Sequence, residues 1–154
     1  MFWIQRPFGS SGVGLGGGRL ATSLVRILVV DDHKRWRQQV CSMLQTRLEL
    51  HILAEAADGL EAVQKAQELK PDLILLDIGL PTLNGIEAAR QIRKFAPESK
   101  IVFVSQESSA DIVQEALSLG TCGYVVKSQA QSDLLAAVDA VLEGRQFASE
   151  GLSG

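Results

Sequence analysis

Short apolar runs alternate with amphipathic segments along the chain from residue 24 onward. Four of these runs are hydrophobic at nearly every position, as expected of strands that are covered on both faces of a parallel sheet. The run at 51–54 is weaker. We expect strands at 24–30, 51–54, 73–76, 100–104 and 124–126.

Helical periodicity fills the intervals that follow these strands. The apolar stripes consist of Trp36, Val40, Met43 and Leu44; Leu60, Val63 and Leu69; Ile86, Ala89 and Ile92; Ile112, Val113, Ala116 and Leu117; and Leu134, Leu135, Val138, Val141 and Leu142. Pro71, Gly120 and Gly144 lie where three of the helices should end. Five strands that alternate with five helices predict an α/β fold, in which helices cover both faces of a parallel sheet.

Residues 1–23 form a glycine-rich segment that we expect to be a flexible tail, because ordering so much glycine is entropically costly. Gly12, Gly14 and Gly17 satisfy the dinucleotide-binding pattern G-x-G-x-x-G. That pattern works between a strand and a helix, whereas here a strand follows it. We therefore do not expect a nucleotide site in this segment.

The composition suits a soluble domain with a real core, since 46% of the residues are hydrophobic and 21% are charged. The net charge of −3 gives no general attraction to nucleic acid. No apolar run approaches the length of about 20 residues that a membrane span needs. Cys41 and Cys122 match no metal or redox spacing and are expected to be reduced thiols in the core, while His33 and His51 are expected to be structural or surface residues. These features favour a cytoplasmic protein.

Chemically active side chains follow four of the expected strands. Asp31 and Asp32 follow the first, Asp77 the third, Ser105 the fourth and Lys127 the fifth. Because the carboxyl ends of parallel strands share one edge, where open α/β folds bind ligands, these groups should converge.

Each of these residues has a simpler interpretation when it is taken alone. Asp31 or Asp32 could cap the following helix, and Asp77 could belong to a turn. Lys127 could be a solvated side chain. Their convergence favours a site instead: carboxylate oxygens suit Mg²⁺, a carboxylate can act as a nucleophile toward phosphorus, and a lysine and a hydroxyl can contact phosphoryl oxygens.

Three segments resemble the receiver domain of two-component response regulators: 29–33 (VVDDH), 76–81 (LDIGLP) and 123–127 (GYVVK). The pair Asn84 and Gly85 falls where that family has a glycine that opens a helix. The resemblance covers about residues 24–144. The strings at 31–33, 123–127 and 143–147 (EGRQF) are similar to the NarL/FixJ branch in particular, whose receivers usually precede a LuxR-type helix-turn-helix domain.

The resemblance implies a flavodoxin-like (CheY-like), doubly wound sheet of five strands in the order 2-1-3-4-5. The receiver would span 24–145, and 146–154 would begin a linker to an output domain. The protein would be a regulator that catalyses only its own phosphorylation and slow dephosphorylation. Its partners would be a histidine kinase and a second copy in a homodimer, with DNA bound only through a helix-turn-helix domain and no membrane partner.

The resemblance also implies a role for each matching residue. Asp77 would be phosphorylated, Lys127 would pair with the phosphoryl group and Ser105 would donate a hydrogen bond to it. Tyr124 would be an aromatic switch that turns inward as Ser105 moves.

For Mg²⁺, the resemblance implies direct ligation by Asp32 and Asp77, ligation mainly through water by Asp31, and a further bond from the backbone carbonyl of Gly79. Gln106 departs from the small or apolar residue usual after Ser105, which affects the expected lifetime of the phosphoryl group. Glu107 is expected to tune hydrolysis.

Two other functions remain open from the sequence. A stand-alone receiver would act through protein–protein contacts. A phosphatase with an aspartate nucleophile would commonly carry a second acid two residues later, where this chain has Gly79.

Overall fold

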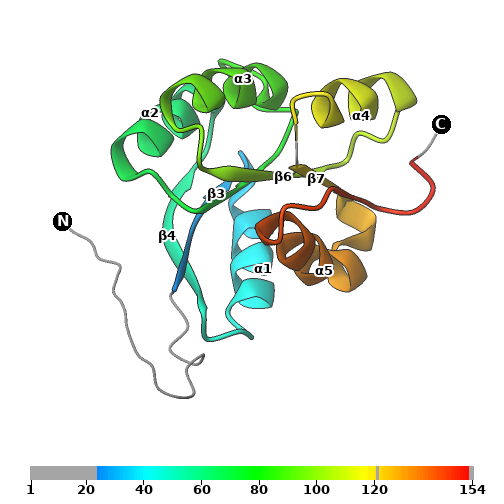
Figure 1. Cartoon of the computed structure of the whole chain (residues 1–154), viewed down its shortest axis with the longest axis horizontal. Helices are drawn as coiled ribbons and strands as arrows, with labels where there is room; N and C mark the ends of the chain where they lie inside the picture. Colours follow the sequence, from blue (N-terminus) through cyan, green and yellow to red (C-terminus); the bar gives the residue numbers. More distant parts are fainter. Residues whose placement is uncertain (1–23, 121, 153–154) are drawn as a thin grey trace.

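The computed structural model describes residues 24–120 and 122–152, and these form one parallel sheet between two helical layers (Figure 1). The strand order is β4-β3-β5-β6-β7-β8. The strands are β3 (Val25–Val30), β4 (Leu50–Ala56), β5 (Leu73–Leu76), β6 (Lys100–Ser105), β7 (Cys122–Val126) and β8 (Phe147–Ala148). The first five follow the expected order 2-1-3-4-5, which confirms the CheY-like fold. The expectation for 1–23, including the glycine pattern, lies outside the described residues.

The helices divide between the two faces of the sheet (Figure 1). They are α1 (Lys34–Leu44), α2 (Gly59–Leu69), α3 (Gly85–Phe95), α4 (Ala110–Leu117) and α5 (Ala130–Leu142). One apolar core lies under α2, α3 and α4, and the other lies under α1 and α5. The central strand β5 is buried at all four positions, because its side chains enter both cores alternately.

A sixth strand extends the sheet beyond the five that we expected. β8 pairs with β7, so that Phe147 lies opposite Gly123 and Ala148 opposite Tyr124. The strand lies in the range 146–154, where we expected a linker to begin. It is only two residues long, and its pairing comes from backbone hydrogen bonds that leave no hydrophobic run in the sequence.

The segment that contains β8 is held by side chains as well. The Ser149 hydroxyl donates to Asp133 Oδ2 at 2.8 Å and accepts from the Val126 amide at 3.2 Å. Leu152 is buried in the core under α4. Gln146 Nε2 donates to two carbonyl oxygens at the end of α4, that of Leu117, its last residue, and that of Gly120, which follows it. We call residues 146–152 the C-terminal strap.

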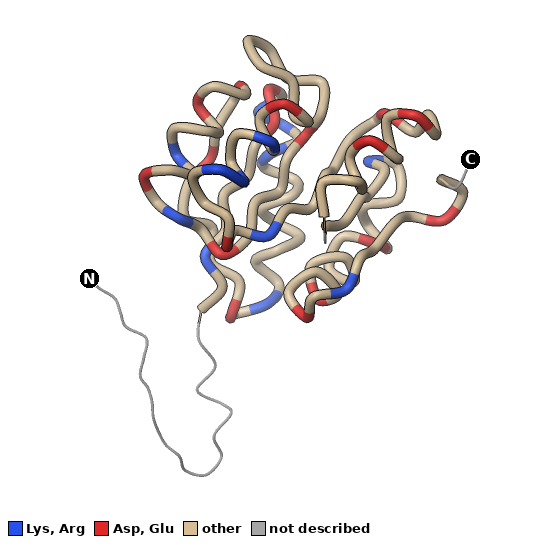
Figure 2. The backbone as a smooth tube through the Cα atoms, turned by 45° about the horizontal axis from the view of Figure 1, so that its top comes forward, with Lys and Arg blue, Asp and Glu red and all other residues tan. Residues whose placement is uncertain are grey.

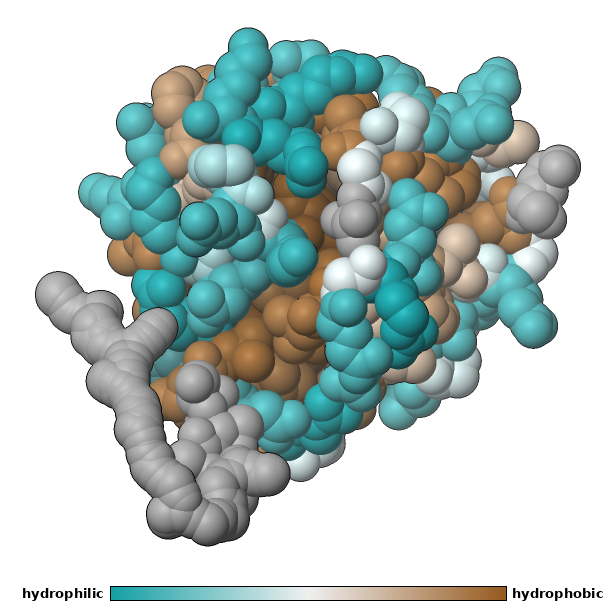
Figure 3. Space-filling view, in the orientation of Figure 1, coloured by the Kyte–Doolittle hydropathy of each residue, from teal (hydrophilic) through white to brown (hydrophobic). Residues whose placement is uncertain are grey.

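Positions of charged residues of both signs are interspersed along the backbone of the helices (Figure 2), in keeping with the small net charge of −3. On the face in Figure 3, polar groups protrude and hydrophobic ones show mainly between them. Among the helices described, none is both long and apolar enough to cross a membrane.

Gly85 allows α3 to begin against the backbone that follows β5. Its amide donates to the Ile78 carbonyl at 2.8 Å, and Asn84 caps the helix by accepting from the Glu87 amide at 3.0 Å. A Cβ atom at Gly85 would come within 2.0 Å of the Asp77 carbonyl oxygen. No side chain fits there unless the backbone of Asp77 moves.

We therefore expect Gly85→Ala to lower the free energy of unfolding by about 1–3 kcal/mol, the usual cost of overpacking. Gly79→Ala is the matched control, because a Cβ atom there would meet nothing within 4 Å. Chemical denaturation of both variants measures the difference. Equal stabilities would contradict this account of the glycine.

Candidate phosphoacceptor site

Two aspartates leave neighbouring strands side by side. Val30 at the end of β3 pairs with Leu76 at the end of β5, so Asp31 and Asp77 follow directly from paired positions. The Asp77 amide donates to the Val30 carbonyl at 3.1 Å, which continues the ladder by one step. The register of the sheet thus forces two carboxylates together at its carboxyl edge.

Lys127 joins these two carboxylates. Its Nζ lies 2.6 Å from Asp31 Oδ2 and 3.2 Å from Asp77 Oδ2. The side chains of Lys127, Asp31 and Asp77 are only 10%, 2% and 7% exposed. At such low exposure the attraction is screened far less than on the surface, so the ammonium group can offset much of the repulsion between the acids.

Backbone groups and an aromatic ring fix the members of this cluster. Asp77 Oδ1 accepts from the Ile78 amide at 2.7 Å and more weakly from the Gly79 amide at 3.4 Å. The Lys127 ammonium lies 5.3 Å from the centroid of the Trp36 ring, within cation–π range. Trp36 therefore contacts the cluster as well as packing on α1.

Asp31 and Asp32 lie at the start of α1 with His33. The His33 amide donates to Asp31 Oδ1 at 2.8 Å, and Arg37 donates to the Asp31 carbonyl at 2.6 Å while its Nε pairs with Glu55 at 2.8 Å. These contacts hold both the side chain and the backbone carbonyl of Asp31. Asp32 is more open, with its side chain 31% exposed.

The donor set suits a hard divalent cation. Ligand atoms of Asp31, Asp32 and His33 all lie within 4.8 Å of one another. Asp31 Oδ2 is buried, and the partner that it contacts is the Lys127 ammonium at 2.6 Å. The space beside the Gly79 Cα is open. Carboxylate and carbonyl oxygens of this kind are ligands that Mg²⁺ accepts.

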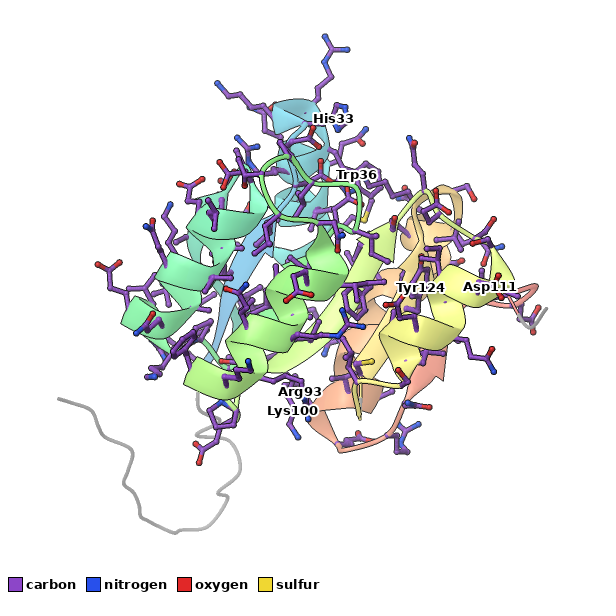
Figure 4. All side chains as sticks on the ribbon, turned by 90° about the horizontal axis from the view of Figure 1, so that it is seen from above. His33, Trp36, Arg93, Lys100, Asp111 and Tyr124 are labelled. Atoms are coloured by element: carbon purple, nitrogen blue, oxygen red, sulfur yellow. The ribbon has the colours of Figure 1, made fainter. Side chains whose placement is uncertain are left out.

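Ser105 and Tyr124 belong to the neighbouring strands. Ser105 ends β6, is buried, and pairs with Val126 immediately before Lys127. Its Oγ accepts from the Glu107 amide at 3.1 Å, which leaves the hydroxyl proton able to point elsewhere. Tyr124 is fully buried, and its hydroxyl donates to the Glu107 carbonyl at 2.7 Å. In this structure the tyrosine already lies inward, between the sheet and α4 (Figure 4).

The structure thus brings Asp31, Asp77 and Lys127 into direct contact and places Asp32 and Ser105 at the same edge. Sequence reasoning missed three neighbours. His33 and Arg37 are polar residues near a helix start, which have no distinctive pattern, and Trp36 carried no sign that it faces a lysine 91 positions later.

Comparison with known proteins agrees with this geometry. The family model named response regulator receiver domain matches residues 27–139. The chain belongs to this family. Receiver domains are phosphoacceptors, and the curated relatives of this one are regulators rather than enzymes.

Relatives include the transcriptional regulatory protein LnrK of Bacillus subtilis (strain 168), which is 35% identical over 121 residues, covering 79% of this chain and 55% of LnrK. The response regulator protein VraR of Staphylococcus epidermidis is 37% identical over 120 residues, covering 78% of this chain and 57% of VraR. This receiver chain therefore spans little more than half the length of these relatives.

Solved structures show the same domain. A two-component response regulator of the LuxR family from Aurantimonas sp. SI85-9A1 has a TM-score of 0.80 and 34% identity, covering 85% of this chain and 94% of that one. The signal receiver domain of a putative NarL from Mycobacterium tuberculosis has a TM-score of 0.75 and 28% identity, covering 80% and 99%. These similarities support the NarL/FixJ branch expected for this receiver.

Burial raises the pKa of Tyr124, the single tyrosine of the chain, from 10.0 to about 12. The folded receiver therefore favours the protonated phenol, whereas the unfolded chain releases that proton near pH 10. We expect this part of the stability to be complete below pH 10 and lost as the pH rises toward 12.

Absorbance of the phenolate follows the titration directly, and denaturation at several pH values follows the stability. Tyr124→Phe is the control that isolates the phenol, since it removes both signals. Titration near pH 10 in the folded protein would show that the ring is not held inward as described.

Proposed function

We propose that Asp77 accepts a phosphoryl group from a partner histidine kinase, with Mg²⁺ bound beside it. The observation that carries this proposal is the ammonium group of Lys127, held between the nearly buried carboxylates of Asp31 and Asp77. Holding two acids this close together does not by itself stabilise the fold. Phosphoryl transfer, in contrast, needs both a carboxylate nucleophile and cations beside it.

The proposed step forms one bond and breaks one. A carboxylate oxygen of Asp77 attacks the phosphorus of a phosphohistidine, the P–N bond breaks, and the imidazole leaves and retains or acquires its proton. The product is an acyl phosphate on Asp77. The phosphoryl group carries about −1.5 to −2 charges, but the Asp77 carboxylate gives up its own charge when the bond forms, so the negative charge at this edge of the sheet grows by less than that.

The surrounding residues can stabilise that charge. Lys127 already contacts Asp77 Oδ2, so a small rotation would bring its ammonium to a phosphoryl oxygen. The Ser105 hydroxyl, whose oxygen accepts from the Glu107 amide, would donate to a second oxygen.

A divalent cation would be held by the carboxylates of Asp31, Asp32 and Asp77 and by the Gly79 carbonyl, with Asp31 acting mainly through water. When bound, Mg²⁺ would reduce repulsion between the acids and the incoming phosphoryl oxygens.

The signal would leave the site through Glu107. Its amide donates to Ser105 and its carbonyl accepts from Tyr124, so a Ser105 that turns toward the phosphoryl group disturbs both hydrogen bonds. Glu107 lies in the loop that leads to α4. We propose that Tyr124 and the α4 region respond to phosphorylation in this way.

The output is proposed from the relatives. LnrK is named a transcriptional regulatory protein, and the LuxR-family regulator shares the fold at 34% identity. A protein of the relatives' length would pair this receiver with a helix-turn-helix domain, so that phosphorylation, through a homodimer, controls transcription. Turnover as a phosphatase is disfavoured, because Gly79 supplies no second acid.

Phosphorylation tests the proposal directly. Incubation with acetyl phosphate and Mg²⁺ should add one phosphoryl group to the intact mass, and chelation of the metal should prevent this. Asp77→Asn should abolish the adduct, while Asp111→Asn on the exposed start of α4 should retain it. Since Trp36 lies near Lys127, its fluorescence in a Trp3→Phe background should change with beryllofluoride. An adduct that persists in folded Asp77→Asn would refute the assignment.

The lifetime of the phosphoryl group gives a second test. Glu107 is next to the site, so we expect Glu107→Ala to change the decay rate of the phosphorylated receiver several-fold by altering access of water. Glu98→Ala, before β6, is the control. Decay is measured by mass spectrometry after removal of the donor, and equal rates in all three proteins would remove this role.

A further inference from the structure

Two carboxylates and one aromatic ring face the Lys127 ammonium group. Its Nζ lies 2.6 Å from Asp31 Oδ2, 3.2 Å from Asp77 Oδ2 and 5.3 Å from the centroid of the Trp36 ring. The carboxylates change their attraction for the lysine when a divalent cation binds them or when Asp77 takes the phosphoryl group. The indole ring is uncharged, so its attraction for the ammonium group stays the same throughout.

The lysine side chain does not hold this position by itself. Lys127 begins the short 3₁₀ helix η3 (Lys127–Gln129), directly after β7. Its ammonium is a compact charge at the end of a flexible four-carbon stem. A divalent cation beside Asp31 and Asp77 would compete for the same oxygens and repel the ammonium, which weakens both ion pairs. The contact with the ring would then keep the ammonium beside Asp77 until the phosphoryl group arrives.

Trp36 is itself fixed on the helix that carries it. It is the third residue of α1, and its side chain packs at the margin of the core under α1 and α5. The next residue, Arg37, donates to the Asp31 carbonyl at 2.6 Å, which ties this turn of α1 to the site. Figure 4 shows Trp36 at the same end of α1 as His33. The ring therefore has a firm base from which to hold the lysine.

Packing alone does not account for the position of the ring. Trp36 is only partly buried, and with Met43 and Gln131 it lines a hollow of about 390 Å³ that Lys127 also borders. The Lys127 side chain is nevertheless only 10% exposed. A smaller side chain at position 36 would extend the hollow toward the ammonium group and admit water to it.

We infer that Trp36 is a positioning residue, whose ring holds the Lys127 ammonium beside Asp77 and keeps water from it as the phosphoryl group arrives. This inference rests on the proposed function and adds to it a residue that touches neither the phosphoryl group nor the acids. Trp36 acts through Lys127 alone.

Exchange of the ring tests the inference in the full chain with acetyl phosphate and Mg²⁺. We expect Trp36→Leu to lower the rate of phosphorylation, followed by intact mass, at least about threefold, because the contact with the ring is lost. Trp36→Phe keeps an aromatic face and should stay within about twofold of the unaltered protein. Met43→Leu is the matched control, since it changes the lining of the same hollow at nearly constant volume and should leave the rate unchanged.

NMR of the Lys127 Hε protons supplies a readout that does not depend on phosphorylation. Protons over the face of an aromatic ring are shifted upfield, and Lys127→Arg identifies the signals by their loss. They should lie upfield in the unaltered protein and in Trp36→Phe, and at ordinary lysine positions in Trp36→Leu. Addition of Mg²⁺ should leave the upfield shift in place.

Other outcomes overturn the inference. Equal losses of rate in Trp36→Leu and Trp36→Phe, or the same loss in Met43→Leu, would mean that packing matters and the ring face does not. An unchanged rate in folded Trp36→Leu would remove the role of the ring. Ordinary positions of the Lys127 signals in the unaltered protein would do so even if Trp36→Leu did not fold.

Failure of the proposed function has a different signature. The unaltered protein would then take no phosphoryl group at Asp77, although the Lys127 signals were shifted upfield. Failure of the inference leaves the adduct at Asp77 intact and changes only its dependence on Trp36.

Discussion

The ion pair of one lysine with two nearly buried aspartates is the constraint on which the rest of this domain depends. Strand register brings Asp31 and Asp77 together, and burial makes their mutual repulsion costly unless a cation stays in contact with both. Lys127 supplies that cation from the position directly after β7, a strand that lies two places from β5 in the sheet. Removing one partner of a buried pair leaves an uncompensated charge. The positions of the three strand ends that carry these residues therefore depend on the charges of the cluster.

That balance explains why the neighbouring groups are arranged as they are. Trp36 and the Ile78 amide restrict Lys127 and the Asp77 carboxylate, while Gly85 lets α3 pack against the backbone of Asp77. Away from the ions, Ser105, Glu107 and Tyr124 form a chain of hydrogen bonds toward α4. A change of charge at Asp77 would therefore act between closely packed groups on one side and a hydrogen-bonded loop on the other.

Local patterns in the sequence predicted five of the six strands and the residues of the ion cluster, whereas the order of the strands came from the resemblance to the receiver family. A buried strand needs a continuous apolar run, and a site at the carboxyl edge needs polar residues directly after such runs, as at Asp77 and Lys127. β8 escaped prediction because two backbone pairings leave no hydrophobic signal. The position of His33 beside the acids and the contact of Trp36 with Lys127 depend on side-chain directions, which a one-dimensional pattern does not contain. Gly85 was expected to open a helix, but the reason, a backbone contact with Asp77, is visible only in three dimensions.

The C-terminal strap fixes the place at which the chain leaves the domain. Ser149 is bonded to both Val126 and Asp133, and Gln146 is bonded to the end of α4, so the strap is fastened to the strand that supplies Lys127 and to a helix on the other face. Any polypeptide that continued past residue 152 would therefore leave the domain from a segment that is hydrogen-bonded to elements on both faces of the sheet, so a shift of β7 or α4 would also move its point of attachment.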